Sequence, residues 1–190
     1  MPDEEDRALI ALAGAGDRAA FTALVDRYSA RVFHLARALV RDDATAEDVL
    51  QDTFLAAWRS AASFRGDGAV AGWLYAIARH AAHRRGRRAD QVATSDASLE
   101  QLGAAAGWGQ PGVAEAVARA EASGALAAAL ADLPDDDRTA LVLHHLLDQT
   151  FAETARVLGL SVAATKSRLH RARLQLAARL RRPGGSHDPR

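Results

Sequence analysis

The side chains in this sequence that could do chemistry are mainly histidines and basic residues. The seven histidines are His34, His80, His83, His144, His145, His170 and His187. None of them belongs to an HExxH motif or to another spacing that is typical of metal ligands. The sequence contains no cysteine, which excludes disulfides, thiol nucleophiles and thiolate zinc sites. It also lacks a P-loop, a dinucleotide-binding glycine loop and a nucleophile elbow. We therefore expect that the protein is not an enzyme and needs no metal or other cofactor.

The basic residues are concentrated in two runs that contain no acidic residue. The first run holds Arg79, Arg84, Arg85, Arg87 and Arg88. The second run holds Lys166, Arg168, Arg171, Arg173, Arg179, Arg181 and Arg182. The net charge is zero because the acids lie elsewhere, but the local field is what attracts phosphate. One such run could be a solvated helix face; two runs, each at the end of an amphipathic helix, favour DNA binding.

The elements that must position these runs are helices. The sequence is 49% hydrophobic but only 5% aromatic, and its apolar residues are mostly Ala and Leu, which favours helix over sheet. Residues 17–89 are predicted to form a first helical unit. An apolar stripe runs from Phe21 to Leu39, a second helix follows Thr45 as its N-cap, and a third begins near Val70 and enters the first basic run.

The rest of the chain is predicted from its composition and its turn residues. Residues 1–16 are expected to form a flexible acidic N-terminus, and residues 90–123, rich in Ser, Gly and Ala, a flexible linker. Residues 124–182 should form a second helical unit, followed by a disordered tail at 183–190. The predicted fold class is therefore all-α, with two small helical domains joined by a flexible linker. No signal peptide and no apolar run of about 20 residues is present, so we expect no membrane insertion and a cytoplasmic location.

The second unit contains the pattern of a helix-turn-helix. Thr150 and Glu153 form a capping box at the start of one helix, and Gly159 is placed to take the left-handed conformation that closes it. Ser161 then caps a final long helix. In this motif the second helix enters the major groove of DNA, so residues 124–182 are predicted to bind duplex DNA.

The final helix has two distinct faces on a helical wheel. The face predicted to point inward consists of Val162, Thr165, Leu169, Ala172 and Leu176. The opposite face is centred on Ser167 and Arg171, whose side chains can bind phosphates and base edges. Thr165 is unusual on an inner face, because its hydroxyl group needs a partner such as a carbonyl one turn back.

Four segments resemble a known family. The sequence FAETARVLGLSVAATKSRLHRARLQL, from Phe151 to Leu176, resembles the promoter-reading region 4 of extracytoplasmic-function (ECF) sigma factors of the sigma-70 family. FTALVDRYSARVFHLARALV, AEDVLQDTFLAAWR and FRGDGAVAGWLYAIARHAAHRRGRR look like successive parts of region 2 of the same family. The resemblance implies a protein that binds core RNA polymerase, opens the minus-ten promoter element with region 2 and reads the minus-thirty-five element with region 4.

The resemblance also implies roles for particular residues. A contact with the clamp helices of the largest polymerase subunit would come from Asp48, Gln51, Asp52, Phe54, Leu55 and Trp58. Phe54 and Trp58 could equally belong to the core of the helical bundle, because aromatic residues at helical spacing are usually buried. An anti-sigma factor is implied as a further partner.

The two DNA contacts are implied in the same way. The minus-ten contact, which captures a base flipped from the non-template strand, would involve Ser63, Phe64, Arg65, Trp73, His80, His83, Arg84, Arg85, Arg87 and Arg88. Trp73 could stack on a base, although packing in the bundle is its simpler role. The minus-thirty-five contact would involve Ala164, Lys166, Ser167, Arg168, His170, Arg171 and Arg173.

The main alternative is a self-standing helix-turn-helix regulator that binds DNA without polymerase. Such a protein would use only residues 124–182, and it would leave the three matching segments of the first unit unexplained. It would also bind its operator tightly in the absence of core polymerase, whereas a sigma factor is expected to bind promoters only with it.

Overall fold

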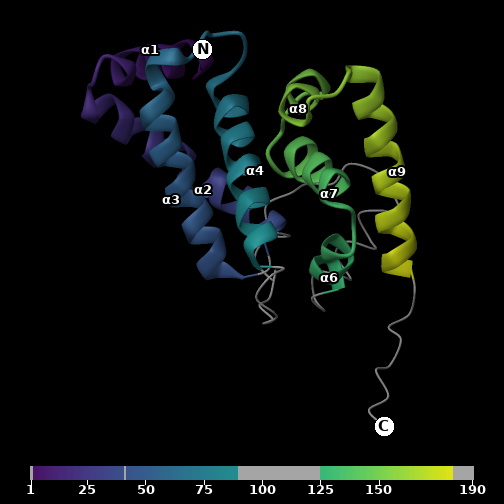
Figure 1. The fold of residues 1–190 in the computed structure, drawn as a ribbon. Helices are drawn as coiled ribbons and strands as arrows, with labels where there is room; N and C mark the ends of the chain where they lie inside the picture. Colours follow the sequence, from purple (N-terminus) through teal and green to yellow (C-terminus); the bar gives the residue numbers. More distant parts are fainter. Residues whose placement is uncertain (1, 41, 90–124, 182–190) are drawn as a thin grey trace.

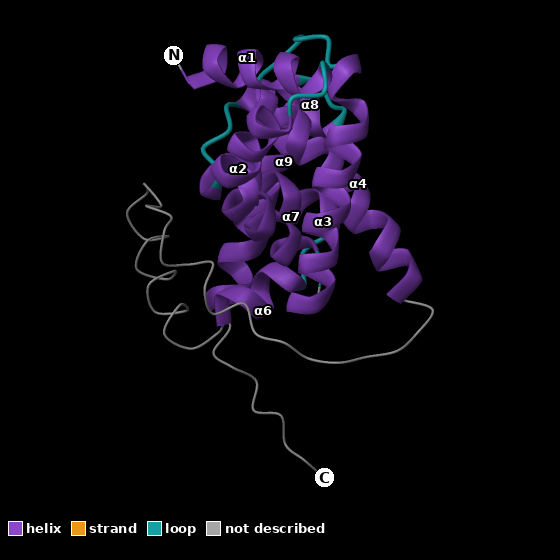
Figure 2. Ribbon diagram, turned by 90° about the vertical axis from the view of Figure 1, so that its left-hand side faces the viewer, coloured by secondary structure: helices purple, strands orange, loops and turns teal. Residues whose placement is uncertain are grey.

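The computed structural model describes residues 2–40, 42–89 and 125–181, and this part of the chain is built from helices and loops without a strand (Figures 1 and 2). The first unit, residues 2–89, contains α1 (Pro2–Gly14), α2 (Arg18–Leu39), α3 (Asp43–Ser60), the short 3-10 helix η1 (Ala61–Ser63) and α4 (Val70–Ala89). The second unit, residues 125–181, contains α6 (Ala125–Ala131), α7 (Asp135–Leu141), the π-helical turn η2 (Val142–Leu146), α8 (Phe151–Leu158) and α9 (Val162–Arg181). None of the described helices is long and apolar enough to span a membrane.

The first residues of the chain form a helix instead of the predicted flexible segment. Helix α1 packs against α2 and η1, and Ile10 and Ala13 are buried in the core. Asp6 is also buried, where it accepts hydrogen bonds from Arg27 and from the Tyr28 hydroxyl group. At the end of α1, a Cβ atom on Gly14 would lie 2.9 Å from the Cα atom of Ala62, so only glycine allows this close approach. Tertiary contacts therefore order a segment whose acidic composition pointed to flexibility.

The predicted start of α3 is wrong by about one turn. The N-cap is Asp42, whose carboxylate accepts the Thr45 backbone N–H at 2.7 Å, so Thr45 lies inside the helix. Both residues are good capping types, but Asp42 already has the extended backbone that an N-cap needs. Hydrogen bonds from the backbone N–H and the hydroxyl group of Thr45 lower the pKa of the Asp42 carboxyl group. The cap sets where α3 begins, and hence which of its residues share a face.

The two units pack directly against each other. Val142, Leu143, Leu147 and Val157 from the second unit are buried in one hydrophobic cluster with the core of the first unit. Helix α8 contacts α4, and α7 contacts α2, so α7 and α8 lie between α4 and α9 (Figure 1). The predicted linker at 90–123 and the predicted tail at 183–190 lie outside the described residues. Burial of these apolar side chains at the interface makes the described part of the chain a single packed body.

Candidate nucleic-acid and protein interfaces

One face of α3 is exposed and combines acidic, amide and apolar groups. Asp48, Gln51 and Leu55 are exposed and Asp52 is half-buried. Their spacing of three, four and seven residues places them on the same side of the helix. Leu55 is 54% exposed, so it adds an apolar group to this otherwise polar face. Such a face suits a partner helix that carries basic and apolar side chains.

The two aromatic residues of α3, Phe54 and Trp58, are more buried than the exposed residues of this face. Phe54 is only 9% exposed and belongs to the core, which is the alternative that its helical spacing also allowed. Trp58 is half-buried, and its ring packs edge-on against Phe21 at 5.1 Å between centroids. Both rings stabilise the bundle beneath the exposed face, because their apolar area is worth most when it is removed from water.

Arg85, predicted to bind DNA, is bound to this acidic face. Its Nε atom donates to Asp52 Oδ2 at 2.9 Å, and its guanidinium group also pairs with Asp48. The hydrogen bond to Asp52 is the main cause of a raised pKa for Arg85. Arg85 therefore joins α4 to α3 in this structure, and its charge is compensated before any phosphate approaches.

A pocket of about 290 Å³ lies beside the loop that follows η1, and we call it the loop pocket. Ser63 at the end of η1, Phe64 and Arg65 from the loop, and Trp73 from α4 line it. The rings of Phe64 and Trp73 are 5.2 Å apart and tilted, and both are partly buried against the core. A nucleobase can stack on aromatic rings and interact with an arginine side chain beside them, so this lining suits a nucleobase. Four of the residues predicted to form the minus-ten contact are thus brought together here.

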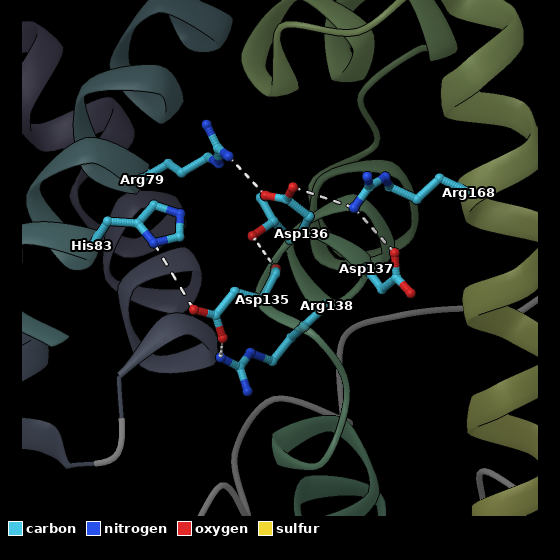
Figure 3. Close-up of polar contacts among 8 residues, drawn as sticks. Arg79, His83, Asp135, Asp136, Asp137, Arg138 and Arg168 are labelled. Carbon is cyan, nitrogen blue, oxygen red and sulfur yellow. Dashed lines mark hydrogen bonds and ion pairs between the residues drawn. The ribbon is translucent and has the colours of Figure 1, made fainter. Parts of the chain in front are cut away.

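The exposed and half-buried residues of α4 point in different directions. His80 and Arg84 are exposed, as a surface for a phosphate backbone requires. Arg79 and His83 are half-buried and face the acidic first turn of α7, with Arg79 Nη2 2.7 Å from Asp136 Oδ1 and His83 Nδ1 3.9 Å from Asp135 Oδ2 (Figure 3). The predicted DNA contacts of Arg87 and Arg88 lie outside the described side chains.

The helix-turn-helix has the local geometry that its sequence predicts. Thr150 and Glu153 form both hydrogen bonds of the capping box, and Gly159 is left-handed at φ 68° and ψ 33°. The Ser161 hydroxyl oxygen accepts the Ala164 N–H at 3.1 Å. The Thr165 hydroxyl donates to the carbonyl of Ser161 at 3.0 Å, which is the partner one turn back that this buried group needs. These bonds set the angle at which α9 leaves the turn.

The outer face of α9 presents most of the residues predicted to bind DNA. The exposed members are Ala164, Lys166, Ser167, His170, Arg171 and Arg173. Arg168 is the exception, because it turns back to α7 and pairs with Asp136 at 3.3 Å and Asp137 at 3.2 Å (Figure 3). Val162, predicted to point inward, is 42% exposed because α9 begins there, one turn before the first buried residue.

Residues that the sequence did not single out support the basic face from below. His144 stacks on Phe151 with 4.3 Å between ring centroids, and Lys166 Nζ lies over the Phe151 ring at 5.3 Å from its centroid. Arg173 Nε donates to His145 Nε2 at 2.9 Å. Burial, together with the charges of Arg173 and His144, lowers the pKa of His145 to about 4. Neutral His145 can therefore hold the Arg173 side chain in place at physiological pH.

The low pKa of His145 predicts a specific pH dependence of stability. An unfolded chain takes up a proton at this histidine near the ordinary histidine pKa of 6.5, whereas the folded chain does so only near pH 4. The stabilising contribution of neutral His145 is thus present above pH 6.5 and is lost as the pH falls towards 4. The loss should be about 1–2 kcal/mol, after allowance for partial solvent exposure. The variant His145→Gln keeps a hydrogen-bond acceptor but does not titrate. Its free energy of unfolding, measured by chemical denaturation, should therefore fall less than that of the wild type as the pH is lowered. The same pH dependence in the variant and the wild type would contradict this assignment.

Within residues 2–40, 42–89 and 125–181, no cluster of three or more His, Asp or Glu side chains is arranged to hold a metal ion.

Comparisons with known proteins match both units. Residues 24–92 match the family model for sigma-70 region 2, and residues 123–176 match the model for sigma-70 region 4. The ECF RNA polymerase sigma factor SigM of Mycobacterium tuberculosis is 39% identical over 175 residues, which cover 92% of this chain and 84% of SigM. RNA polymerase sigma factor CnrH of Cupriavidus metallidurans is 34% identical, over 94% of this chain and 96% of its own length.

A solved structure of CnrH in complex with the cytosolic domain of CnrY has the same fold. It aligns with a TM-score of 0.67 and 31% identity, and the match covers 92% of this chain and 96% of that chain.

Proposed function

The chain belongs to the ECF group of the sigma-70 family, and we propose that it binds core RNA polymerase and directs promoter-specific transcription initiation. In this proposal residues 17–89 act as region 2 and residues 124–182 as region 4. The observation that carries the proposal is that one chain presents an exposed acidic and apolar face on α3 and an exposed basic face on α9. A self-standing DNA-binding regulator would need only the second of these.

The polymerase contact is assigned to four residues of α3. Asp48, Gln51, Asp52 and Leu55 would bind the clamp helices of the largest polymerase subunit, with Leu55 as the apolar centre. Trp58 would support them from the edge of the face. The polar residues would select a basic partner, while burial of Leu55 would supply much of the affinity.

Opening of the minus-ten element is assigned to the loop pocket and α4. Separating bases costs a few kcal/mol per unstacked step, so a pocket that holds a flipped base must offset it. Phe64, Arg65 and Trp73 would line that pocket around the base. His80 and Arg84, with Arg79 and His83 once they are uncovered, would bind the phosphates of the same strand.

Reading of the minus-thirty-five element is assigned to the outer face of α9. Arg171 and Lys166 can bond guanine edges, and Ser167 can bond a base or a phosphate. The small side chain of Ala164 near the helix start allows α9 to lie close to the bases. Arg173 and His170 would contact the flanking backbone.

The other partners follow from the family. The polymerase would supply the chemistry, so no catalytic residue is assigned to this chain. We place the protein in the cytoplasm, where core polymerase acts, and propose that an anti-sigma factor binds it when it is not needed.

In-vitro transcription with core polymerase on a genomic template library tests the proposal. We expect transcripts that start at a defined set of promoters and that are absent when the chain is omitted. A gel shift with the recovered promoters should give negligible specific binding by the free chain and strong binding with core. Tight sequence-specific binding by the free chain, without transcripts from the mixture, would favour the self-standing regulator.

A further inference from the structure

We propose that two histidines of the turn η2, together with Phe151 at the start of α8, set where Lys166 and Arg173 of α9 meet the minus-thirty-five element. We call His144, His145 and Phe151 the histidine platform. Its members are positioning residues, because each acts on DNA through a basic residue of α9. The inference rests on the proposed function of α9 and extends it to residues that bind no DNA themselves.

The histidine platform is built on the π-helical turn η2. The Leu147 N–H donates to the carbonyl of Val142, five residues back, at 3.0 Å, which makes this turn wider than an α-helical one. Asp148 has a left-handed backbone, at φ 51°, and follows the turn. Neighbouring side chains of an α-helix diverge by about 100°. Here the rings of His144 and His145 lie only 4.8 Å apart between centroids, and both serve the same helix, α9.

One half of the histidine platform lies against Lys166. His144 Nδ1 is 2.7 Å from the carbonyl oxygen of Gln149, so this nitrogen carries the proton and donates it in a hydrogen bond. The bond fixes the plane of the imidazole, which stacks on Phe151 with 4.3 Å between centroids and 29° between planes. Lys166 Nζ is 5.3 Å from the centroid of the Phe151 ring, within the range of a cation–π interaction. The ring therefore restricts a long side chain that would otherwise populate many rotamers.

The other half holds Arg173. Its Nε atom donates to His145 Nε2 at 2.9 Å, which leaves the donors of both Nη atoms for a phosphate. Because the guanidinium group is planar, fixing Nε also fixes the direction of these donors. The low pKa of His145 keeps this partner neutral, so it positions Arg173 without compensating its charge. Arg168, by contrast, pairs with the carboxylates of Asp136 and Asp137.

The two halves should affect promoter binding differently. Lys166 is assigned to base edges, so the Phe151 ring should contribute to the choice of base. Arg173 is assigned to the flanking backbone, so His145 should contribute to affinity for every promoter and to its salt dependence. Side chains that only pack the core would change stability and neither of these properties.

Phe151→Leu tests the first half. Leucine keeps an apolar side chain at this position but removes the ring face beneath the ammonium group. We expect the holoenzyme to lose roughly twofold to fivefold of its preference at the base that Lys166 reads. The measurement is binding to single-base variants of the minus-thirty-five element, in a promoter that the wild-type holoenzyme transcribes.

His145→Leu tests the second half. Without the acceptor, Arg173 is free to leave the phosphate, so the affinity should fall roughly threefold to tenfold for every promoter in the series. The slope of log affinity against log salt concentration should decrease by about one. His145→Gln keeps an acceptor and should restore most of the affinity and of the slope.

Double variants separate positioning from a general structural effect. In a Lys166→Ala chain, Phe151→Leu should cause no further change in base preference, because the residue through which it acts is missing. In an Arg173→Ala chain, His145→Leu should likewise cause no further loss. The matched controls Phe33→Leu and His34→Leu change half-buried residues of α2 in the same way and should alter neither base preference nor salt dependence.

The outcomes distinguish this inference from the proposed function. Loss of an effect in the double variants, with rescue by His145→Gln, would support the histidine platform. Equal effects with and without Lys166 and Arg173, or a loss of thermal stability alone, would overturn it, while transcripts from the wild-type holoenzyme would leave the proposed function standing. If the wild-type chain started no transcripts with core polymerase, the proposed function itself would be overturned.

Discussion

Replacing Leu55 by aspartate is expected to weaken association with core polymerase by about tenfold to a hundredfold, without lowering the stability of the free protein. Leu55 is 54% exposed on α3, and its neighbours on that face are Asp48, Gln51 and Asp52. In the free chain the new carboxylate stays in water, so unfolding should be unaffected. In the complex it would be buried against an apolar partner surface without a counter-charge, which carries a large desolvation cost.

Leu12→Asp is the matched control for this prediction. Leu12 is 50% exposed on α1, so it undergoes the same chemical change at a similar exposure but away from α3. The affinity of each variant for fluorescently labelled core polymerase and its thermal unfolding should be measured together. Normal binding by Leu55→Asp, or an equal loss in both variants, would show that the assigned face of α3 does not contact the polymerase.

Asp52→Arg is a less direct probe of the same surface. Asp52 is half-buried and accepts a hydrogen bond from Arg85, so an arginine there would repel Arg85 and disturb the contact between α3 and α4. A loss of polymerase binding in that variant would mix an interface effect with a change in the bundle. Leu55 avoids this difficulty because its side chain projects into solvent.

The second large effect is expected at the minus-thirty-five element. Arg171→Ala should weaken promoter binding by the holoenzyme by about 1–3 kcal/mol, if the guanidinium group reads a base edge in the major groove. The variant should also become indifferent to base changes at one position of the element, because the contact that distinguishes them is gone. Binding to a series of promoters with single-base changes measures both effects.

Arg168→Ala distinguishes base reading from a general loss of charge. Arg168 lies on the same helix but pairs with Asp136 and Asp137, so its removal should lower stability and leave the base preference unchanged. If Arg171→Ala instead weakened binding equally for every promoter in the series, Arg171 would be a phosphate contact and would carry no sequence information.

Features of this protein that depend on neighbours in the sequence could be predicted from the sequence alone. The capping box of Thr150 and Glu153, the left-handed Gly159 and the hydrogen bond of Thr165 to the carbonyl of Ser161 each depend on residues only a few positions apart. The helical periodicity of the apolar residues in α9 identified Leu169 and Ala172 as buried and Ser167 and Arg171 as exposed. The helical fold and the family were therefore accessible from local patterns.

Features that depend on distant residues were decided only by the tertiary structure. Arg85 meets Asp48 from 37 positions away, and Arg168 meets Asp137 from 31 positions away, so a helical wheel could not distinguish either arginine from one that faces DNA. Contacts between distant residues also explain why α1 forms a helix, why Phe54 is buried and why Arg156 lies against Gly68. Each of these features depends on which helices pack against one another. That packing is determined by the total apolar area buried over the whole chain, so no single segment decides it.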